Sequence, residues 1–382
     1  MTIPTHTPLA DSPLDLLLLS IVTERTGIVV PPHQKERFRL LVAEGCRKLA
    51  TTLEGYIAAL TTSGRDHPVF RHLVEGITIN ETYFFRDETQ IAFLRDVWLP
   101  HIIHRRGTGE QPTLQVWSAA SSSGEELYTI AMLLHDLLGE TLNQWTLRLM
   151  GTDIDDDALA KAQRGVYTNW SFRCTPEKDR DRHFQPVQDG FAVCPALKAL
   201  TTFQHLNLVT DSFPVVTRDL WNCDLILCRN VFIYFSQDVV RRVLAKLAES
   251  LVPEGILLLG ASDGVSDEAP GLALCHHGNA FYFMRAESAL HSPVSPKRPA
   301  RTVAPRPRGV PRAPAAGASS GGCDRSGGRG NDRGHTQGAA PRHSPGRRRA
   351  RRFRHRMERH YGRSCPCAAR SPEPPDGRHH SG

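Results

Sequence analysis

Apolar residues recur at helical spacing through residues 9–78, which predicts a helical domain at the start of the chain. One helix is expected around residues 14–21 and another from Pro32, and residues 56–60 and 69–74 add shorter helices. The expected buried positions of the first two helices are Leu14, Leu17, Leu18 and Ile21, then Phe38, Leu41, Val42 and Leu49. The opposite face of the second helix is basic, with Lys35, Arg37, Arg39, Arg47 and Lys48.

Apolar runs of strand length alternate with helical patterns over residues 111–286, as in a parallel sheet with helical crossovers. Residues 223–228 are apolar except for Asp224, which predicts a central strand. Residues 255–260 predict a second buried strand, and residues 281–284 are expected to close the sheet. Between residues 167 and 203 the alternation of strand and helix patterns is interrupted, which predicts a small inserted antiparallel β-subdomain. We therefore expect an α/β fold with a Rossmann-like doubly wound sheet behind a helical N-terminal domain.

A connector, residues 79–110, joins these two parts, and we expect it to contribute to a binding site. Its first half contains the string NETYFFR at residues 80–86. Its second half, residues 87–106, has a helical pattern with Ile91, Leu94, Val97 and Trp98 on one face.

Charge is distributed unevenly along the chain. Residues 288–382 hold 21 Lys and Arg against 5 Asp and Glu, whereas the preceding 287 residues hold 26 against 35. The Pro/Arg/Gly-rich composition after residue 286 buries too little apolar surface to offset chain entropy, so residues 287–382 are expected to form a disordered basic tail. The unusual composition of this segment is also what translation in a shifted reading frame would give. Its arginines would bind phosphate without sequence preference, so no specific nucleic-acid partner is expected.

Apolar runs in the sequence fall well short of the roughly 20 residues that cross a bilayer, and no secretory signal is visible. The nine cysteines lack metal spacing, and His101, His104, His135 and His183 show no ligand spacing. We therefore expect a cytoplasmic protein with reduced thiols, no metal and no membrane insertion.

Two strings point to a nucleoside ligand. Residues 114–126, LQVWSAASSSGEE, place small residues between an apolar strand and a helix, and residues 151–155, GTDID, place Asp153 at the tip of the next strand. Small side chains let the backbone approach a ligand, and a carboxylate there accepts hydrogen bonds from ribose hydroxyls. The glycine patterns that bind phosphate are absent from the sequence, which favours an adenosine ligand without phosphate, such as S-adenosylmethionine.

Together with residues 80–86, Asn207-Leu208 and residues 228–235 (CRNVFIYF), these strings resemble the CheR family of chemotaxis receptor glutamate O-methyltransferases in order and spacing. The resemblance covers roughly residues 14–286. It implies a helical domain, an S-adenosylmethionine-binding methyltransferase domain at 111–286, and a β-subdomain at 167–203 inserted after the second strand of the sheet.

The resemblance also implies a reaction: methyl transfer from S-adenosylmethionine to glutamate side chains of chemoreceptors, giving glutamyl methyl esters and S-adenosylhomocysteine. Arg86 and Tyr234 are placed at the reacting methyl group. A glutamate is ionised at neutral pH, so a fixed guanidinium such as that of Arg86 suits the task better than a general base. The implied cofactor contacts are Asn80, Thr82, Arg86, Glu126, Asp153, Asn207, Leu208, Arg229 and Asn230. The implied partner is the cytoplasmic helical region of membrane chemoreceptors, and we expect a monomer.

Several of these assignments have plainer alternatives. Asp153 could cap the next helix, Glu125 could replace Glu126 as the ligand, and Arg86 could form a surface ion pair. Tyr234 could serve only for packing, and the basic face of the second helix could be solvated charge rather than a docking surface for acidic receptor helices. A catalytically idle S-adenosylmethionine-binding adaptor is the alternative function.

The sequence departs from the family pattern at three places. Leu127 stands where proline is usual, and residues 260–263 read GASD in place of glycine-histidine-serine-glutamate. The turn at residues 185–190 is shorter than the glycine-rich loop of members that tether to a receptor's C-terminal peptide. The second change predicts an altered loop at the cofactor's edge, and the third predicts docking without a tether.

Overall fold

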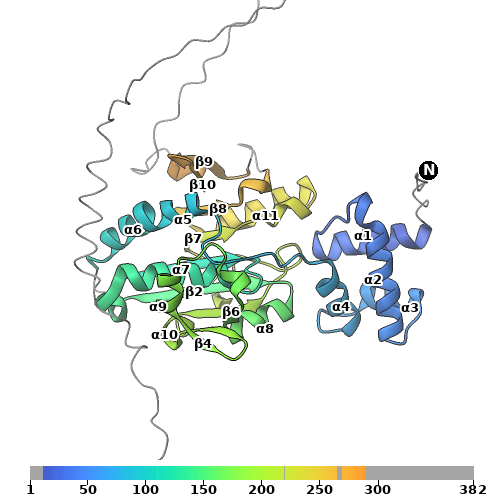
Figure 1. Ribbon diagram of the computed structural model, residues 1–382. Coiled ribbons are helices and arrows are strands. Elements are labelled where there is room, and N and C mark those ends of the chain that lie inside the picture. The colour runs from blue at the N-terminus through green and yellow to red at the C-terminus, as the bar shows by residue number, and fades with distance from the viewer. Residues whose placement is uncertain (1–11, 110, 219, 265–268, 290–382) are drawn as a thin grey trace, which may run out of the picture. The chain divides into compact units, whose positions relative to one another are not determined.

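The computed structural model describes residues 12–109, 111–218, 220–264 and 269–289 (Figure 1). The predicted basic tail lies outside these residues, apart from residues 287–289. Among the described residues, no helix is both long enough and apolar enough to cross a membrane.

Four helices follow one another at the start of the chain: α1 (Pro13–Thr26), α2 (Lys35–Lys48), α3 (Leu53–Thr62) and α4 (Pro68–Ile77). A capping box starts α1, because the Ser12 hydroxyl accepts from Asp15 N while the Asp15 carboxylate accepts from Ser12 N. Gly27 ends α1 with a φ of 77°, and a Cβ at this position would lie 2.6 Å from Val209 Cγ2. Glycine is therefore required by both conformation and space.

The buried face of α1 differs from the prediction. Leu14 and Leu17 were expected in the core but are 36% and 48% exposed. The core-facing side of α1 instead passes through Leu18, Val22 and Thr26, each one turn of the helix after the last. The run of four leucines from Leu16 to Leu19 fits several helical registers, so its spacing could not select the correct face.

The main sheet has seven strands in the order β6-β2-β1-β7-β8-β10-β9. Strands β6, β2, β1, β7 and β8 are parallel, and β10 runs antiparallel to both β8 and β9. The strands are β1 (Thr113–Ala119), β2 (Thr146–Asp153), β6 (Thr201–His205), β7 (Cys223–Cys228), β8 (Leu251–Leu259), β9 (Leu272–His277) and β10 (Ala280–Arg285).

Both faces of this sheet are buried at its centre. In β7, Ile226 and Cys228 belong to the cluster that α11 (Gln237–Ser250) covers, whereas Leu225 and Leu227 point to the other face and are equally inaccessible to solvent. Helices α7 (Glu125–Leu138) and α8 (Asp156–Arg164) also pack on the sheet. The predicted doubly wound fold and the central position of residues 223–228 are therefore confirmed.

The end of the sheet differs from the prediction. Strand β8 begins four residues earlier than residue 255, and residues 281–284 lie in β10, between β8 and the edge strand β9. The turn between β9 and β10 consists of Gly278, with a φ of 57°, and Asn279. This two-residue Gly-Asn sequence is a hairpin signal that the strand pattern alone did not include.

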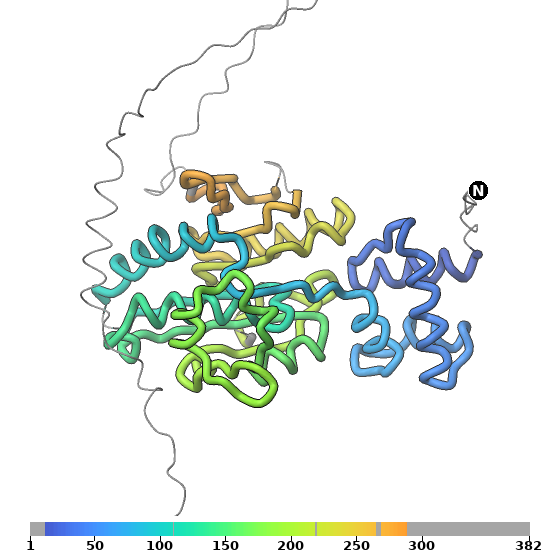
Figure 2. Tube along the Cα trace, in the orientation of Figure 1, coloured from blue at the N-terminus to red at the C-terminus, as the bar shows by residue number. Residues whose placement is uncertain are grey.

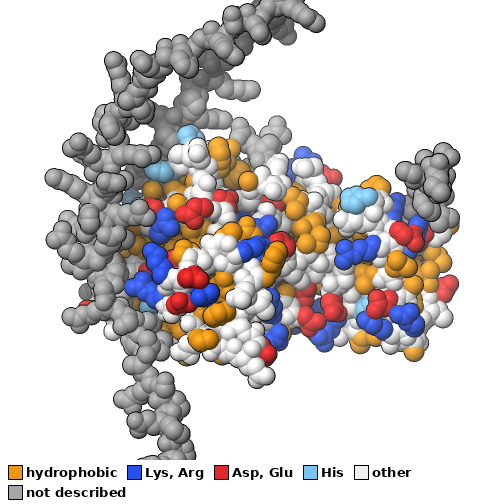
Figure 3. Space-filling view, viewed as in Figure 1, with side chains coloured by type: hydrophobic (Ala, Val, Ile, Leu, Met, Phe, Trp, Pro, Cys, Tyr) orange, Lys and Arg blue, Asp and Glu red, His pale blue; other side chains and the backbone are white. Residues whose placement is uncertain are grey.

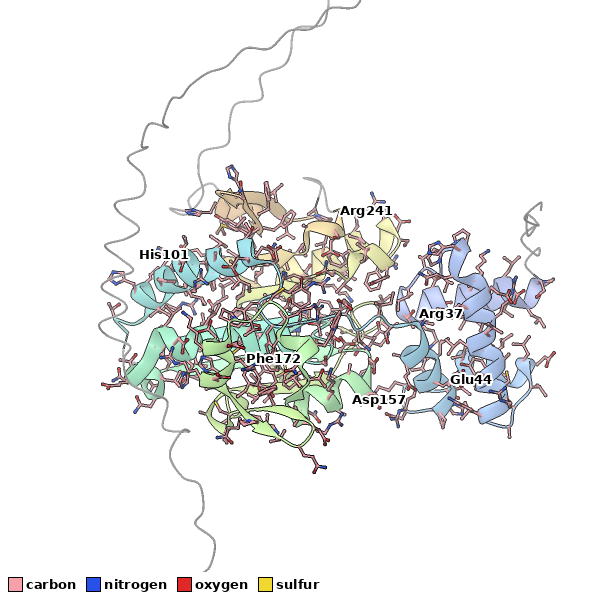
Figure 4. The ribbon with its side chains drawn as sticks, in the orientation of Figure 1. Arg37, Glu44, His101, Asp157, Phe172 and Arg241 are labelled. Atoms are coloured by element: carbon pink, nitrogen blue, oxygen red, sulfur yellow. The ribbon has the colours of Figure 1, made fainter. Side chains whose placement is uncertain are left out.

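The inserted subdomain contains a second, three-stranded sheet of β3 (Val166–Tyr167), β5 (Gly190–Val193) and β4 (Phe184–Val187). Helices α9 (Glu177–His183) and α10 (Pro195–Lys198) flank it. Phe172 (Figure 4) stacks on Phe84 of the connector with ring centroids 5.0 Å apart. Residues 201–203, which the sequence placed in the insertion, already belong to β6 of the main sheet.

The connector leads from α4 into a nearly continuous helical segment (Figure 2). This segment consists of α5 (Glu88–Phe93), a π-helical turn (Leu94–Trp98) and α6 (Leu99–Arg106). The chain's last described element is α12 (Ala286–Ala289). Phe84 N donates to Ser171 O, and Phe85 N donates to Thr129 Oγ1, so the connector is held against both the insertion and α7.

Candidate active site

One cavity lies beyond the carboxyl ends of β1, β2 and β7, where the strand order changes direction. Ligands of open α/β sheets bind at this switch point. The cavity holds about 970 Å³, counting its open mouth. All residues predicted for the site line it: Asn80, Thr82, Arg86, Glu126, Asp153, Asn207, Leu208, Arg229, Asn230 and Tyr234. Their individual roles towards a ligand remain predictions.

The loop after β1 forms one wall of the cavity with an unusual backbone. Ala120, Ser122 and Gly124 have φ values of 61°, 49° and 91°, all in the left-handed region. A Cβ at Gly124 would lie 2.8 Å from Ala162 Cβ, which explains the glycine. Non-glycine residues in this region carry strain, and such strain concentrates at functional sites.

Asp153 is held at the tip of β2, with 6% of its surface exposed. Its Oδ2 accepts from Ser122 N at 2.7 Å and its Oδ1 accepts from Asp155 N at 2.9 Å. Burial raises the pKa of the Asp153 carboxyl to about 6, although these backbone hydrogen bonds oppose the rise. The cap of α8 is Asp155, whose Oδ1 accepts from the amides of the helix, so Asp153 is not the helix cap.

Glu125 and Glu126 have different surroundings in the structure. Glu126 lines the cavity, accepts from Ser118 Oγ at 2.7 Å and pairs with Arg229 at 3.2 Å. Glu125 is 1% exposed and points elsewhere, accepting from Ser123 Oγ and from Ser171 Oγ of the insertion. Of the two, only Glu126 is placed to meet a ligand in the cavity.

Two buried polar atoms at the cavity wall have spare hydrogen-bonding capacity. Arg229 has 3% of its side chain exposed and donates from Nη2 to Arg86 O at 2.7 Å, but its Nε has no hydrogen-bond partner among the described residues. Within the same ranges, Ser121 Oγ is also buried without a partner. Because unsatisfied buried polar atoms are uncommon, both suit a polar ligand.

Arg86 and Tyr234 lie on the cavity lining near the connector. Arg86 donates to Glu81 O at 2.5 Å, and its guanidinium carbon lies 5.5 Å from the centre of the Tyr83 ring. Within the described part of the chain it has no carboxylate partner, so the ion-pair alternative is not realised here. Burial raises the pKa of the Tyr234 hydroxyl, and the nearby charge of Arg86 opposes that rise.

Asn80 and Asn207 line the cavity, but their side chains are already bonded within the protein. Asn80 Nδ2 donates to Asp155 Oδ2 at 2.7 Å, and its Oδ1 accepts from Ser122 Oγ at 3.1 Å. Asn207 Nδ2 donates to Arg25 O at 2.7 Å, which ties the loop after β6 to the end of α1. Both therefore shape the cavity, while Leu208 gives it an apolar wall.

Two residues that organise the site were missed by the sequence analysis. Asp155 accepts from both Thr78 Oγ1 and Asn80 Nδ2 while it caps α8, so one side chain fixes the connector at β2. Its position in GTDID, two residues after the strand-tip acid, is the signal that could have identified it.

Asp263 is the second missed residue. It is 7% exposed, and its carboxylate accepts from the backbone amides of Asn230, Phe232 and Gly260 at 2.7–3.0 Å. Asn230 has a φ of 62°, and a Cβ at Gly260 would lie 2.9 Å from Asn230 N. The GASD string was expected to alter a loop at the edge of the cofactor site. In the structure its Asp263 instead supports the loop from Asn230 to Tyr234 through hydrogen bonds to that loop's backbone.

Residues 80–277 match the family described as CheR methyltransferase, SAM binding domain. The chain belongs to the CheR methyltransferase family. The match starts at Asn80 and ends at residue 277, so it includes almost all of the connector and every strand of the main sheet except β10. The predicted family is confirmed, and the matched residues carry the description of an S-adenosylmethionine-binding domain.

Relatives of this CheR-family protein are named chemotaxis protein methyltransferases. The Escherichia coli (strain K12) protein is 31% identical over 64% of this chain and 82% of its own length. Chemotaxis protein methyltransferase 1 of Pseudomonas aeruginosa is 34% identical over 51% of this chain and 70% of its own. The Vibrio parahaemolyticus protein is 35% identical over 53% and 72%.

Proposed function

We propose that this protein transfers a methyl group from S-adenosylmethionine to glutamate side chains of chemoreceptors, giving glutamyl methyl esters and S-adenosylhomocysteine. The observation that carries the proposal is that one cavity brings two carboxylates of low exposure together with a tyrosine and with an arginine that has no carboxylate partner among the described residues. Asp153 and Glu126 lie on the sheet side, and Arg86 and Tyr234 come from the connector and from the loop after β7. Family membership supports the same reaction class.

The residues on the sheet side fit the cofactor. Asp153 and Glu126 are acceptors that suit ribose hydroxyls. Arg229 Nε and Ser121 Oγ are buried groups that a polar ligand would satisfy. When bound, S-adenosylmethionine supplies a methyl group activated by a positively charged sulfur.

Arg86 and Tyr234 fit the substrate side. A glutamate carboxylate has a reference pKa of about 4.3, so it is already ionised at neutral pH and no general base is needed. Arg86 carries a fixed charge that can align this carboxylate, and the Tyr234 hydroxyl can orient it by donating a hydrogen bond. The methyl ester forms at a carboxylate oxygen as the methyl–sulfur bond breaks, which leaves neutral S-adenosylhomocysteine as the product.

We propose that the receptor's helices dock on the basic residues of α2. Arg37 (Figure 4) and Arg47 are exposed, whereas Arg39 pairs with Asp15 at 3.1 Å and Lys48 pairs with Glu44 at 2.8 Å. On the face seen in Figure 3, acidic and basic side chains lie beside one another over the N-terminal helices. Arg37 and Arg47 are therefore the residues we expect to steer an acidic partner.

Transfer of radioactive methyl groups to receptor-containing membranes tests this function. The wild-type protein should label the receptor band, and mild base should release the label as methanol, because methyl esters are base-labile. Receptors whose methylation-site glutamates are replaced by alanine are the matched control. A catalytically idle adaptor would bind S-adenosylhomocysteine but leave the membranes unlabelled. The cavity position of Arg86 and Tyr234 favours the enzyme over the adaptor.

A further inference from the structure

A second group of chemistry-bearing side chains lies away from the cavity, at the opposite end of α7. His135 and Asp136 are in the last turn of α7, and His183 is the final residue of α9 in the inserted subdomain. None of the three lines the cavity described above. In the sequence His183 lies 47 positions after Asp136, so its spacing gave no ligand pattern.

His135, Asp136 and His183 bring one ring nitrogen each from the histidines and one carboxylate oxygen close together. These three atoms all lie within 4.8 Å of one another. His183 Nε2 is 3.3 Å from Asp136 Oδ1, and His135 Nδ1 is 3.6 Å from the same oxygen. The two imidazole rings meet edge to face, with centroids 5.6 Å apart.

These separations suit a tetrahedral metal site. Zinc binds histidine nitrogen at about 2.0–2.1 Å and carboxylate oxygen at about 2.0–2.2 Å, so neighbouring ligand atoms of a tetrahedron lie about 3.3–3.6 Å apart. The two nitrogen–oxygen separations, 3.3 and 3.6 Å, fall in this range. Two histidines and one carboxylate form a three-ligand set that leaves the fourth position to water.

Unsatisfied atoms give independent support. His135 Nδ1 and Asp136 Oδ1 are buried and have no hydrogen-bond partner among the described residues. His183 is 1% exposed, which is unusual for a histidine whose Nδ1 also lacks a partner there. A metal ion would satisfy the two inward atoms directly. The side chains of His135 and Asp136 are 20% and 33% exposed, which gives an ion access from solvent.

Arg182 is the positive charge that faces the group. Its Nη1 lies 3.3 Å from Asp136 Oδ2, an oxygen that His183 Nε2 also approaches at 3.4 Å, whereas Oδ1 lies near both histidines. The carboxylate can therefore accept from Arg182 with one oxygen and coordinate a cation with the other. The guanidinium weakens the attraction for a cation, so we expect tight but not extreme affinity.

We propose that His135, Asp136 and His183 form a binding site for a divalent transition-metal ion of the zinc type. The ion joins the last turn of α7, which is packed on the main sheet, to α9 of the inserted subdomain. Its role is structural: it fixes the insertion to the methyltransferase sheet.

Zinc titration of the metal-stripped full chain, in competition with a chromophoric chelator, tests this proposal. The chain contains 18 His and 9 Cys, so the decisive quantity is the difference between wild type and variants. His135→Ala and Asp136→Asn change partly exposed side chains and should each remove one tight equivalent, weakening it by at least ~100-fold. Even the loss of an outer-shell partner costs about 10–100-fold. His104→Ala, at an exposed position on α6, is the matched control and should bind like wild type.

Cobalt substitution gives a second measurement. The wild type should show the visible absorption bands of a tetrahedral cobalt site, and these should be absent from His135→Ala. Zinc should also raise the melting temperature of wild type and His104→Ala more than that of His135→Ala. If wild type and His135→Ala bind the same number of zinc ions with the same affinity and give the same cobalt spectrum, the proposed site does not exist.

Discussion

At the residue scale, Asp153 is the side chain whose chemistry is most constrained. It is buried and bonded to two backbone amides, and it faces the cavity. Asp153→Ala should weaken S-adenosylhomocysteine binding by ~1–3 kcal/mol, the cost of leaving buried polar groups unpaired. Calorimetry on the purified protein measures this. Asp157→Ala, which removes an exposed carboxylate from α8, is the control and should bind like wild type; equal affinities for all three proteins would remove Asp153 from the site.

The raised pKa of Asp153 gives a pH dependence with a definite sign. Below its pKa of about 6 the carboxyl is protonated and loses acceptor capacity. If ribose hydroxyls donate to it, S-adenosylhomocysteine affinity should fall as the pH drops from 7.5 through 6 to 5. The Asp153→Asn variant should bind more weakly and with a flatter pH profile. Identical pH profiles for the two proteins would show that the titrating group lies elsewhere.

Arg86 and Tyr234 should matter for turnover more than for cofactor affinity. Arg86→Ala removes the charge that aligns the substrate, so we expect a large fall in methyl transfer. Tyr234→Phe should reduce the rate by ~10-fold, about 1.4 kcal/mol of transition-state stabilisation, if the hydroxyl orients the carboxylate. Rates are measured with receptor and cofactor saturating. Wild-type rates in both Tyr234→Phe and Tyr234→Ala would leave Tyr234 as a packing residue.

At the scale of elements, Asp155 links the cap of α8 to the placement of the connector. Asp155→Ala should cost about 0.5–2 kcal/mol of unfolding free energy through the lost cap. It should also weaken S-adenosylhomocysteine binding, because Thr78 and Asn80 lose their acceptor. Thr52→Ala is the matched control, since Thr52 caps α3 and does not line the cavity. If both variants lose stability but neither loses affinity, the hydrogen bonds from Thr78 and Asn80 to Asp155 do not position the connector for ligand binding.

The loop after β7 depends on hydrogen bonds to Asp263, as the connector depends on those to Asp155. Its carboxylate holds three backbone amides behind Asn230, so Asp263→Ala should lower methyl transfer and destabilise the fold by ~1–3 kcal/mol. Asp263→Glu restores the acid that is usual in the family at this place and should recover part of the activity. Denaturation curves and transfer rates separate the two effects. An Asp263→Ala protein with unchanged rate and stability would contradict this role.

At the scale of the whole molecule, elements with a clear pattern of apolar and polar positions could be predicted from the sequence. Residues 223–228 are apolar and lie centrally in the sheet, and Asp153 follows an apolar strand and lies at its tip. The edge hairpin of β9 and β10 and the face of α1 could not be predicted as reliably. Their burial depends on partners distant in sequence, and the leucine run of α1 fits more than one register.

The candidate site likewise contains residues that the sequence predicted and residues that it missed. Residues placed by motif, such as Glu126 and Arg229, line the cavity as expected. The supporting residues Asp155 and Asp263 act through hydrogen bonds to segments 75 and 33 residues away, which spacing does not reveal. His135 and His183 showed no ligand spacing in the sequence for the same reason, and Asp136 was not considered, since only the fold brings α9 to α7.

The predicted tail can be tested by truncation. Among the residues that the structure describes, those that line the cavity all lie between Thr26 and Phe235. Removal of residues 290–382 should therefore leave methyl transfer to receptor membranes unchanged while it alters salt-dependent binding to anionic surfaces. A truncated protein that folds, as judged by its melting transition, but transfers no methyl groups would show that the tail takes part in catalysis.

The central claim is that methyl groups reach glutamate side chains through this one cavity. Mass spectrometry of receptor peptides after reaction with S-adenosylmethionine tests it most directly, with wild type and Arg86→Ala compared at equal cofactor occupancy. The account predicts methyl esters on glutamate side chains with wild type and a large reduction with Arg86→Ala. Methyl groups found on other residue types, or unmodified receptor peptides with a wild-type protein that binds S-adenosylhomocysteine, would contradict it.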